Sequence, residues 1–411
     1  MIPRNTYLAQ LEAVQDQDLI KVVTGIRRCG KSALMLEFQS LLKSKGIDEK
    51  RILSLNFEER ENCQFEDWQA VYDIIMSKLP IAEKNYVFLD EVQQIPHFEK
   101  LVDALYVKKD IDLYITGSNA YLLSSELTTL LSGRYIAINL HPFSFAEYAA
   151  AFGEQKDTSR LFRQYMNSSC FPEAVKLSKV SPEITNAYLK SLYESIVVKD
   201  ISKRYHLRKF DTLQRIINFL FDSIGSIVSP NNIADELKRV TKESLSHNTV
   251  QKYIRYFTES YLIYPIQLYN IKGKCLLTSN CKYYVVDLGL KNILQTNKVD
   301  ADLGHKLENV VYFELLRRGG EIYVGKSENN EVDFVVKKYD GQLEYYQVAY
   351  TVNDEKTLKR ELSSLRKIRD NYPKYLLTTD FDNAIIDGIK KINLIDWLLD
   401  NKYCCTFAHQ F

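Results

Sequence analysis

The chain has 411 residues, more than a single hydrophobic core of about 250–300 residues usually holds, so two or three domains are expected. Its 54 lysines and arginines against 53 acidic residues leave a net charge of +1, which excludes a globally basic nucleic-acid-binding chain and leaves a local patch for that role. No apolar run approaches about 18 residues, and the seven cysteines contain no C-x-x-C pair, so we expect no membrane span and reduced thiols in a cytoplasmic protein.

A phosphate-binding pattern organises the first part of the chain. The short apolar run 19–23 predicts a strand, and apolar residues recur at helical spacing over 34–41. Between them, residues 25–32 match G-x-x-x-x-G-K-[ST], a loop whose backbone N–H groups surround a triphosphate at the start of a helix. Lys31 brings a charge to the β- and γ-phosphates and Ser32 a hydroxyl to Mg²⁺, so ATP and Mg²⁺ are the predicted cofactors. The residues predicted to bind the nucleotide are Gly25, Ile26, Arg27, Arg28, Cys29, Gly30, Lys31, Ser32 and Ala33.

Two acidic residues follow the third predicted strand. After a second strand over 51–57 and a helix over 66–79, the apolar run 86–89 is typical of a strand covered on both faces of a parallel sheet. It ends in Asp90 and Glu91. We expect Asp90 to hold Mg²⁺ and Glu91 to polarise the attacking water, although strand ends also carry solvated acids.

Two further strands carry polar residues at their ends. The strand 111–115 runs into a Thr-Gly-Ser-Asn sequence, in which Ser118 and Asn119 are predicted to sense the γ-phosphate, although these residue types also favour a plain turn. A fifth strand over 134–140 begins with Arg134. Two interpretations of Arg134 stay open, a charge-neutralising finger and a solvated edge residue.

The chain resembles a prokaryotic family of AAA-type P-loop ATPases. The resemblance rests on the phosphate loop, Leu89-Asp90-Glu91, Thr116-Gly117-Ser118, Ser132-Gly133-Arg134 and the sequence HPFSFAEY at 141–148. It covers nearly the whole chain and implies an α/β fold, with a five-stranded parallel sheet in residues 1–143, the loop strand central, and a helical lid in residues 144–205. In this family's terms the loop is Walker A, and Asp90-Glu91 is Walker B. The family also carries a C-terminal domain of unknown function related to restriction-endonuclease folds.

Positive charge gathers at the end of the predicted lid. The stretch 199–209 contains Lys199, Lys203, Arg204, Arg208 and Lys209. One interpretation is contact with nucleic-acid phosphates, and the other is a solvated or interdomain helix.

Residues 206–299 predict a winged helix-turn-helix, with helices near 210–220, 231–239 and 246–261 and wing strands near 262–266 and 282–286. Amide and basic side chains on the third helix suit base edges and phosphates. This set is Asn248, Gln251, Lys252 and Arg255. Because winged helices also bind proteins, DNA and a protein partner both stay open.

Residues 300–411 resemble the core of the restriction-endonuclease fold. The metal site of that fold takes an aspartate from one strand and a Glu/Asp-x-Lys triplet from the next. Asp333 is present, with Glu308 on the preceding helix, but the triplet position reads Gln347-Val348-Ala349 and lacks both the acid and the lysine. Glu344 lies three residues away, hence on the opposite face of a strand. We therefore expect a catalytically inactive nuclease-like domain that serves as a docking or regulatory surface for a protein partner.

These features favour an ATP-hydrolysing protein whose nucleotide state repositions the winged-helix and C-terminal domains. A slow nucleotide switch that binds DNA or protein needs the same loop, so the sequence does not separate the two. An ATP-dependent nuclease is the third interpretation.

Overall fold

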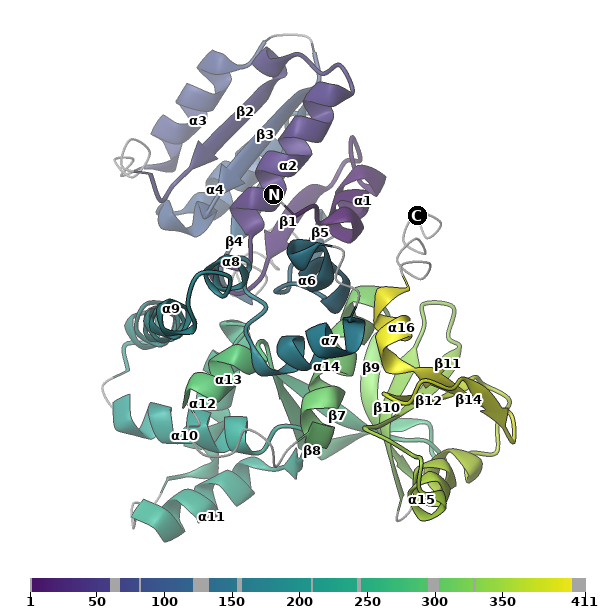
Figure 1. Ribbon diagram of the computed structural model, residues 1–411. Coiled ribbons are helices and arrows are strands. Elements are labelled where there is room, and N and C mark those ends of the chain that lie inside the picture. The colour runs from purple at the N-terminus through teal and green to yellow at the C-terminus, as the bar shows by residue number, and fades with distance from the viewer. Residues whose placement is uncertain are drawn as a thin grey trace. The chain divides into compact units, whose positions relative to one another are not determined.

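The computed structural model describes residues 2–59, 67–80, 83–120, 133–153, 157–207, 210–241, 245–294, 303–327 and 330–400. Ser132, Arg208 and Lys209, which the sequence singled out, lie outside these residues. The chain forms two compact units, one mainly of residues 1–142 and one of residues 143–258 and 262–404. Figure 1 labels their helices and strands. The predicted domain boundaries within the second unit stay predictions.

The first unit is a five-stranded sheet with helices on both faces (Figure 1). All neighbouring strands are parallel, which confirms the predicted parallel sheet. The strand order is β2-β3-β4-β1-β5, so β4 is central and the loop strand β1 is fourth, which corrects the expected central position of β1. The strands are β1 Ile20–Thr24, β2 Ile52–Asn56, β3 Asn85–Asp90, β4 Ile111–Gly117 and β5 Tyr135–Asn139, and the helices are α1 Asn5–Ala13, α2 Lys31–Ser44, α3 Trp68–Lys78 and α4 Phe98–Tyr106.

Burial explains why these strands take interior or edge positions. Every residue of β1, β3 and β4 is buried, as their continuous apolar runs predict, whereas the edge strands β2 and β5 are partly exposed. Apolar side chains of α3 and α4 pack on one face of the sheet. Phe38 of α2 packs against Phe88 of β3 and Tyr114 of β4. The rings of Phe88 and Tyr114 stack on each other with their centroids 4.7 Å apart.

The second unit is built on one nine-stranded sheet of order β13-β14-β12-β11-β10-β9-β7-β8-β6. Strands β7 and β9 pair in parallel, so one sheet joins strands from the predicted 206–299 and 300–411 regions. The strands are β6 Ile227–Val228, β7 Ile263–Asn270, β8 Cys275–Val285, β9 Glu321–Ser327, β10 Asn330–Lys337, β11 Leu343–Ala349, β12 Lys374–Thr378, β13 Ala384–Ile386 and β14 Ile389–Asn393.

Helices precede and cover this sheet (Figure 1). The stretch predicted as a lid is helical, and α9 continues directly into the π-helix η4. The helices are α6 Phe145–Phe152, α7 Thr158–Asn167, α8 Pro172–Leu177, α9 Pro182–Ser195, η4 Ile196–Lys203, α10 Phe210–Asp222, α11 Pro230–Thr241, α12 His247–Glu259, α13 Leu288–Leu294, α14 Leu303–Arg318, α15 Glu355–Arg366 and α16 Leu394–Leu399.

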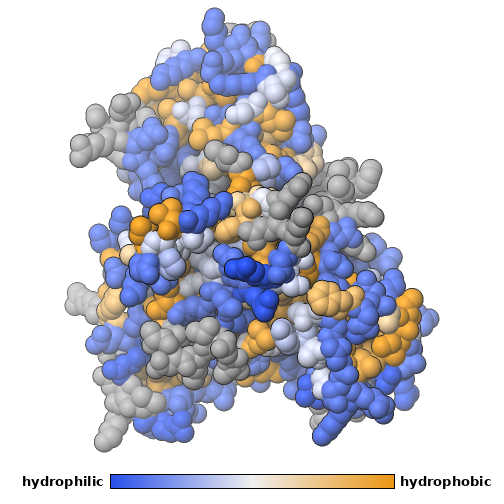
Figure 2. All heavy atoms as spheres, in the orientation of Figure 1, coloured by the Kyte–Doolittle hydropathy of each residue, from blue (hydrophilic) through white to orange (hydrophobic). Residues whose placement is uncertain are grey.

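Polar and apolar surface are mixed over the face drawn in Figure 2, where hydrophobic residues form separate groups among hydrophilic ones. Within the described part of the chain, no helix combines the length and the apolar character needed to cross a bilayer.

Candidate functional site

The phosphate-type loop lies between the carboxyl end of β1 and the first turn of α2. Gly25 and Gly30 have φ angles of 149° and 106°, in the region that favours glycine. A Cβ atom on Gly25 would lie 2.2 Å from the carbonyl oxygen of Leu140, so only glycine fits there. This geometry puts the loop at the amino end of a 14-residue helix, where backbone N–H groups and the helix dipole favour an anion.

A buried arginine from the N-terminal segment supports the loop. The guanidinium of Arg4 donates to the carbonyl oxygens of His141 at 2.7 Å and Cys29 at 3.3 Å. Burial also raises the pKa of the Cys29 thiol, which therefore packs as a neutral group. No sequence pattern marks Arg4 as part of the site, because its contact with the loop spans 25 positions.

Lys31 joins the loop to the acidic strand end. Its Nζ donates to the carbonyl oxygens of Gly25 at 3.1 Å and Ile26 at 3.4 Å. The same atom lies 3.5 Å from Oε1 of Glu91, and both side chains are more than nine-tenths buried. The predicted Lys31 and Glu91 therefore meet, although 60 positions separate them in the sequence.

Asp90 and Glu91 lie at the carboxyl end of β3, and Thr116 of β4 holds both. The Thr116 hydroxyl donates to Oδ1 of Asp90 and accepts a hydrogen bond from the Glu91 backbone N–H at 3.0 Å. Glu91 has a φ of 54°, a left-handed conformation that costs about 1–3 kcal/mol and recurs at functional sites. The role of Thr116 as the residue that holds both acids was not predicted from the sequence.

The Glu91 carboxylate is held ionised. Its Oε2 accepts hydrogen bonds from the Ser118 hydroxyl and from the Gln93 amide, each at 2.5 Å. Burial opposes ionisation, but the Lys31 ammonium and these hydrogen bonds outweigh it, so the pKa of Glu91 lies below its ordinary value. A buried, ionised carboxylate beside a lysine can accept a proton at neutral pH.

The remaining predicted residues flank this centre. Asn119 is 2% exposed at the end of β4, next to Ser118. Arg27 pairs with Glu58 at 3.2 Å, while Arg28 is exposed on the loop. Ser32 is exposed in the first turn of α2, and Ala33 follows it.

Ser32 and Asp90 fit a hard cation in donor chemistry. They supply a hydroxyl and a carboxylate, the oxygen ligands that Mg²⁺ takes. Ser32 follows Lys31 and Asp90 precedes Glu91 in the sequence. The ion pair between Lys31 and Glu91 therefore brings the backbone segments of Ser32 and Asp90 together.

The structure places Arg134 away from this centre. Its carbonyl oxygen accepts from the backbone N–H of Ile20, the first residue of β1, so Arg134 lies at the amino edge of the parallel sheet. Along β1, at about 3.3 Å per residue, Ile20 at this edge lies about 16 Å from Gly25. Its guanidinium pairs with Asp103 at 2.9 Å. Arg134 therefore does not reach the site of its own chain, which contradicts its predicted catalytic role there.

In the second unit, Gln347 lies on the opposite face of the sheet from Glu308. Its amide donates to Glu361 at 3.1 Å and its carbonyl oxygen accepts from Ser364 at 3.2 Å, both on α15. Glu308 lies on α14, whose Tyr312 packs on Phe334, the cross-strand neighbour of Tyr346. Because side chains alternate along β11, Gln347 faces away from α14. Gln347 therefore does not lie beside Glu308, as the metal-ligand position of a restriction-endonuclease site would.

A lysine from β8 neutralises the carboxylates on the α14 side. Lys282 Nζ lies 2.9 Å from Glu308 and 2.6 Å from Glu331, and it is 3% exposed. Asp333 accepts from the backbone N–H of Val348 at 2.8 Å, and burial with the nearby Glu308 carboxylate raises its pKa well above the ordinary value. Tyr284 also donates to Glu308, at 3.0 Å. Among the described residues, no group of three or more His, Cys, Asp or Glu side chains is arranged to hold a metal ion.

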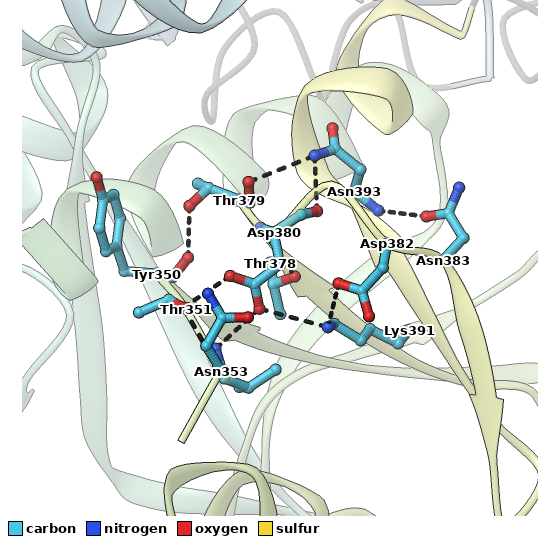
Figure 3. A network of polar contacts seen from close by, with 11 residues as sticks. Tyr350, Thr351, Asn353, Thr378, Thr379, Asp380, Asp382, Asn383, Lys391 and Asn393 are labelled. Atoms are coloured by element: carbon cyan, nitrogen blue, oxygen red, sulfur yellow. Dashed lines mark hydrogen bonds and ion pairs between the residues drawn. The ribbon is translucent and has the colours of Figure 1, made fainter. Parts of the chain in front are cut away.

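Another polar network connects the carboxyl ends of β11, β12 and β14 (Figure 3). Asp380 accepts from the Thr351 hydroxyl at 2.7 Å and the Val352 backbone N–H at 2.9 Å, and it lies 3.4 Å from Lys391. Asn393 donates to the carbonyl oxygen of Asp380 at 2.8 Å. These groups satisfy one another, so the network fastens three strands together.

A groove of about 680 Å³ runs along α12. All four residues predicted to face DNA line it, together with Ile254, Thr258 and Pro265 of β7. The groove thus collects amide and basic side chains on one surface.

Comparisons with known proteins place the chain in a family. An AAA domain model matches residues 17–149, and a domain of unknown function, DUF8612, matches residues 159–301. An uncharacterized protein of Haemophilus influenzae is 38% identical over 406 residues, covering 97% of this chain and 99% of that protein. One of Methanocaldococcus jannaschii is 28% identical over 400 residues, covering 92% and 85%.

Among solved structures, the Walker-type ATPase of Pyrococcus abyssi matches with a TM-score of 0.47 and 15% identity, covering 72% of this chain and 96% of that one. Cdc6p of Pyrobaculum aerophilum matches with a TM-score of 0.30 and 12% identity, covering 72% and 94%. The near full-length match to the Haemophilus influenzae protein, together with the AAA match, shows that the chain belongs to the family of that protein and carries an AAA-type P-loop domain at its N-terminal end.

Proposed function

We propose that the protein binds ATP with Mg²⁺ at the loop of residues 25–33 and hydrolyses it. The observation that carries this proposal is the meeting of Lys31 and Glu91 at 3.5 Å beside the amino end of α2. Phosphate positioning and a water-activating carboxylate are the two protein contributions that phosphoryl transfer to water requires.

In this mechanism the loop N–H groups and the Lys31 ammonium bind the β- and γ-phosphates. The Glu91 carboxylate, which Ser118 and Gln93 orient, accepts a proton from the attacking water. Ser118 and Asn119 contact the γ-phosphate at the end of β4. Mg²⁺, held by Ser32 and Asp90, would neutralise phosphate charge when bound.

The test separates binding from turnover. Lys31→Ala should abolish binding of a fluorescent ATP analogue, because its ammonium contacts the ground-state phosphates. Glu91→Gln should retain binding within about threefold but lose phosphate release by about 100-fold or more, since an amide is no base. The matched control is Glu83→Gln, two residues before β3 and therefore at the end of that strand opposite Glu91, which should keep wild-type turnover. Unchanged hydrolysis in Glu91→Gln would remove Glu91 as the base.

A slow nucleotide switch remains the alternative, and steady-state turnover of the wild-type protein, with and without DNA, distinguishes it. In both cases, nucleotide state in the first unit controls the second. Because β7 and β9 pair within one sheet, the regions 206–299 and 300–411 would respond as one body.

A second candidate function is nucleic-acid binding through α12. The order α10, β6, α11, α12, β7, β8, with β6 and β7 both antiparallel to β8, supports a winged helix-turn-helix. The groove on α12 presents amide groups for base edges and basic groups for phosphates. The nuclease-like region, whose carboxylates Lys282 neutralises, would serve as a docking or regulatory surface rather than a nuclease.

A further inference from the structure

The first residues of the basic stretch, 199–203, lie in a π-helix. Residues 196–203 continue α9 as η4, a rare geometry that frequently marks functional segments. Lys199 and Lys203 are exposed, whereas Asp200 and Ile201 are buried. Since the two lysines are four residues apart, about one helical turn, both project from the exposed side of η4.

A stacked tyrosine pair fixes this stretch against α12. Tyr205, two residues after η4, lies face to face with Tyr256 of α12, with ring centroids 3.7 Å apart and planes 17° apart. Such an offset or stacked aromatic contact contributes about 0.5–1.5 kcal/mol beyond its buried area. Tyr256 is 3% exposed and Tyr205 is half-buried, so the stacked pair holds the chain that follows η4 against α12.

Basic residues of α12 surround the same ring. Lys252 Nζ lies 5.9 Å from the Tyr256 ring centroid and Arg255 Cζ lies 5.8 Å from it. Both residues also line the α12 groove. The stacked pair therefore brings the chain just after η4 against the part of α12 that carries Lys252 and Arg255, although about 50 residues separate the two segments in the sequence.

We propose that Lys199 and Lys203 of η4 extend the α12 groove into one surface that binds the phosphate backbone of duplex DNA. This inference rests on the proposed nucleic-acid function of α12. Charge complementarity favours this occupant, because cations from two segments that pack together suit a polyanion with a charge about every 1.7 Å along its axis. The lysines would contact backbone phosphates and set the register, while Asn248 and Gln251 contact base edges.

The surface predicts how binding depends on salt. Each neutralised phosphate contributes a slope of about −0.9 to the logarithmic dependence of affinity on salt concentration. Lys199→Gln/Lys203→Gln should therefore flatten this slope by about 1.8 and weaken binding between about 10- and 100-fold at 100 mM salt. Since both lysines are exposed, the variant should fold as the wild-type protein does, which circular dichroism checks.

The experiment is fluorescence anisotropy with a 30-base-pair duplex between 50 and 200 mM salt, with and without ATP, on the full chain. The charge-matched control is Lys356→Gln/Lys390→Gln, which removes two exposed lysines on α15 and β14 of the second unit and should keep the wild-type slope. A third variant, Lys252→Gln/Arg255→Gln, tests the groove itself.

The outcomes separate the two proposals. Loss of binding in the η4 and groove variants, with the control unchanged, supports the joint surface. Wild-type binding that weakens only in the groove variant keeps α12 as a DNA site and overturns the role of η4. Absence of duplex binding by the wild-type protein at 50 mM salt overturns both and favours a protein partner for α12.

Discussion

Removing the Lys282 ammonium should destabilise the second unit strongly and in a pH-dependent way. Lys282 is 3% exposed and lies within 3 Å of Glu308 and Glu331, while Asp333 shares the cluster. Lys282→Met keeps the apolar stem and removes the charge. Breaking a buried ion pair on one side typically costs about 3–5 kcal/mol, because the partner charge stays buried without compensation. Glu331 is about one-third exposed, so water screens its share, and we expect a loss near 3 kcal/mol at pH 8.

The pH dependence follows from Asp333. Its pKa in the folded protein is raised well above the ordinary value of 3.8, so the folded state keeps a proton that the unfolded state has released. Stability therefore falls as pH rises from about 4 through the folded-state pKa, by up to about 1.4 kcal/mol per pH unit. Without the Lys282 ammonium the folded-state pKa rises further. The penalty of Lys282→Met should accordingly be larger at pH 8 than at pH 6.

Urea unfolding followed by Trp397 fluorescence measures this loss. The chain has two tryptophans, so a Trp68→Phe background leaves the signal to Trp397 of α16, in the second unit. Lys337→Met is the matched control, because its pair with Glu321 is about half exposed on both sides and should cost no more than about 0.5 kcal/mol. The double variant Lys282→Met/Glu308→Gln should recover part of the loss. Equal, pH-independent losses in Lys282→Met and Lys337→Met would refute the reasoning.

Further outcomes follow from the placement of single residues. Arg134→Ala should keep phosphate release within about twofold in a steady-state assay, since Arg134 lies at the amino edge of the sheet; a drop of tenfold or more would contradict this placement. Thr116→Val should slow phosphate release by about 10–100-fold, because it removes the hydroxyl that orients Asp90 and Glu91, and wild-type turnover would show that the hydroxyl is dispensable. Purified protein should leave single- and double-stranded DNA and RNA intact in Mg²⁺ and Mn²⁺, and cleavage that disappears in Asp333→Ala would overturn the assignment of Lys282 as the neutralising group.

The sequence alone predicted the parts of the candidate site whose geometry is local. A loop of two glycines followed by Lys-Ser between a strand and a helix needs no distant contact, and Gly25 and Gly30 have the expected φ angles. The buried run before Asp90 likewise marked an interior strand of a parallel sheet. Lys31 and Glu91 were predicted to have separate roles, and their approach to 3.5 Å follows from the common carboxyl edge at which parallel strands end.

Only the tertiary structure decided which distant side chains lie in these sites and which lie elsewhere. Strand order and direction put Arg134 at the opposite edge from the loop, although its position after a glycine resembled a catalytic arginine. Because side chains alternate along β11, Gln347 faces α15. Arg4 and Lys282 reach the phosphate loop and the carboxylate cluster from segments 25 or more residues away. Residue type and spacing encode the period of a helix or strand, whereas the partner of a buried charge depends on strand order, register and packing, which no single segment contains.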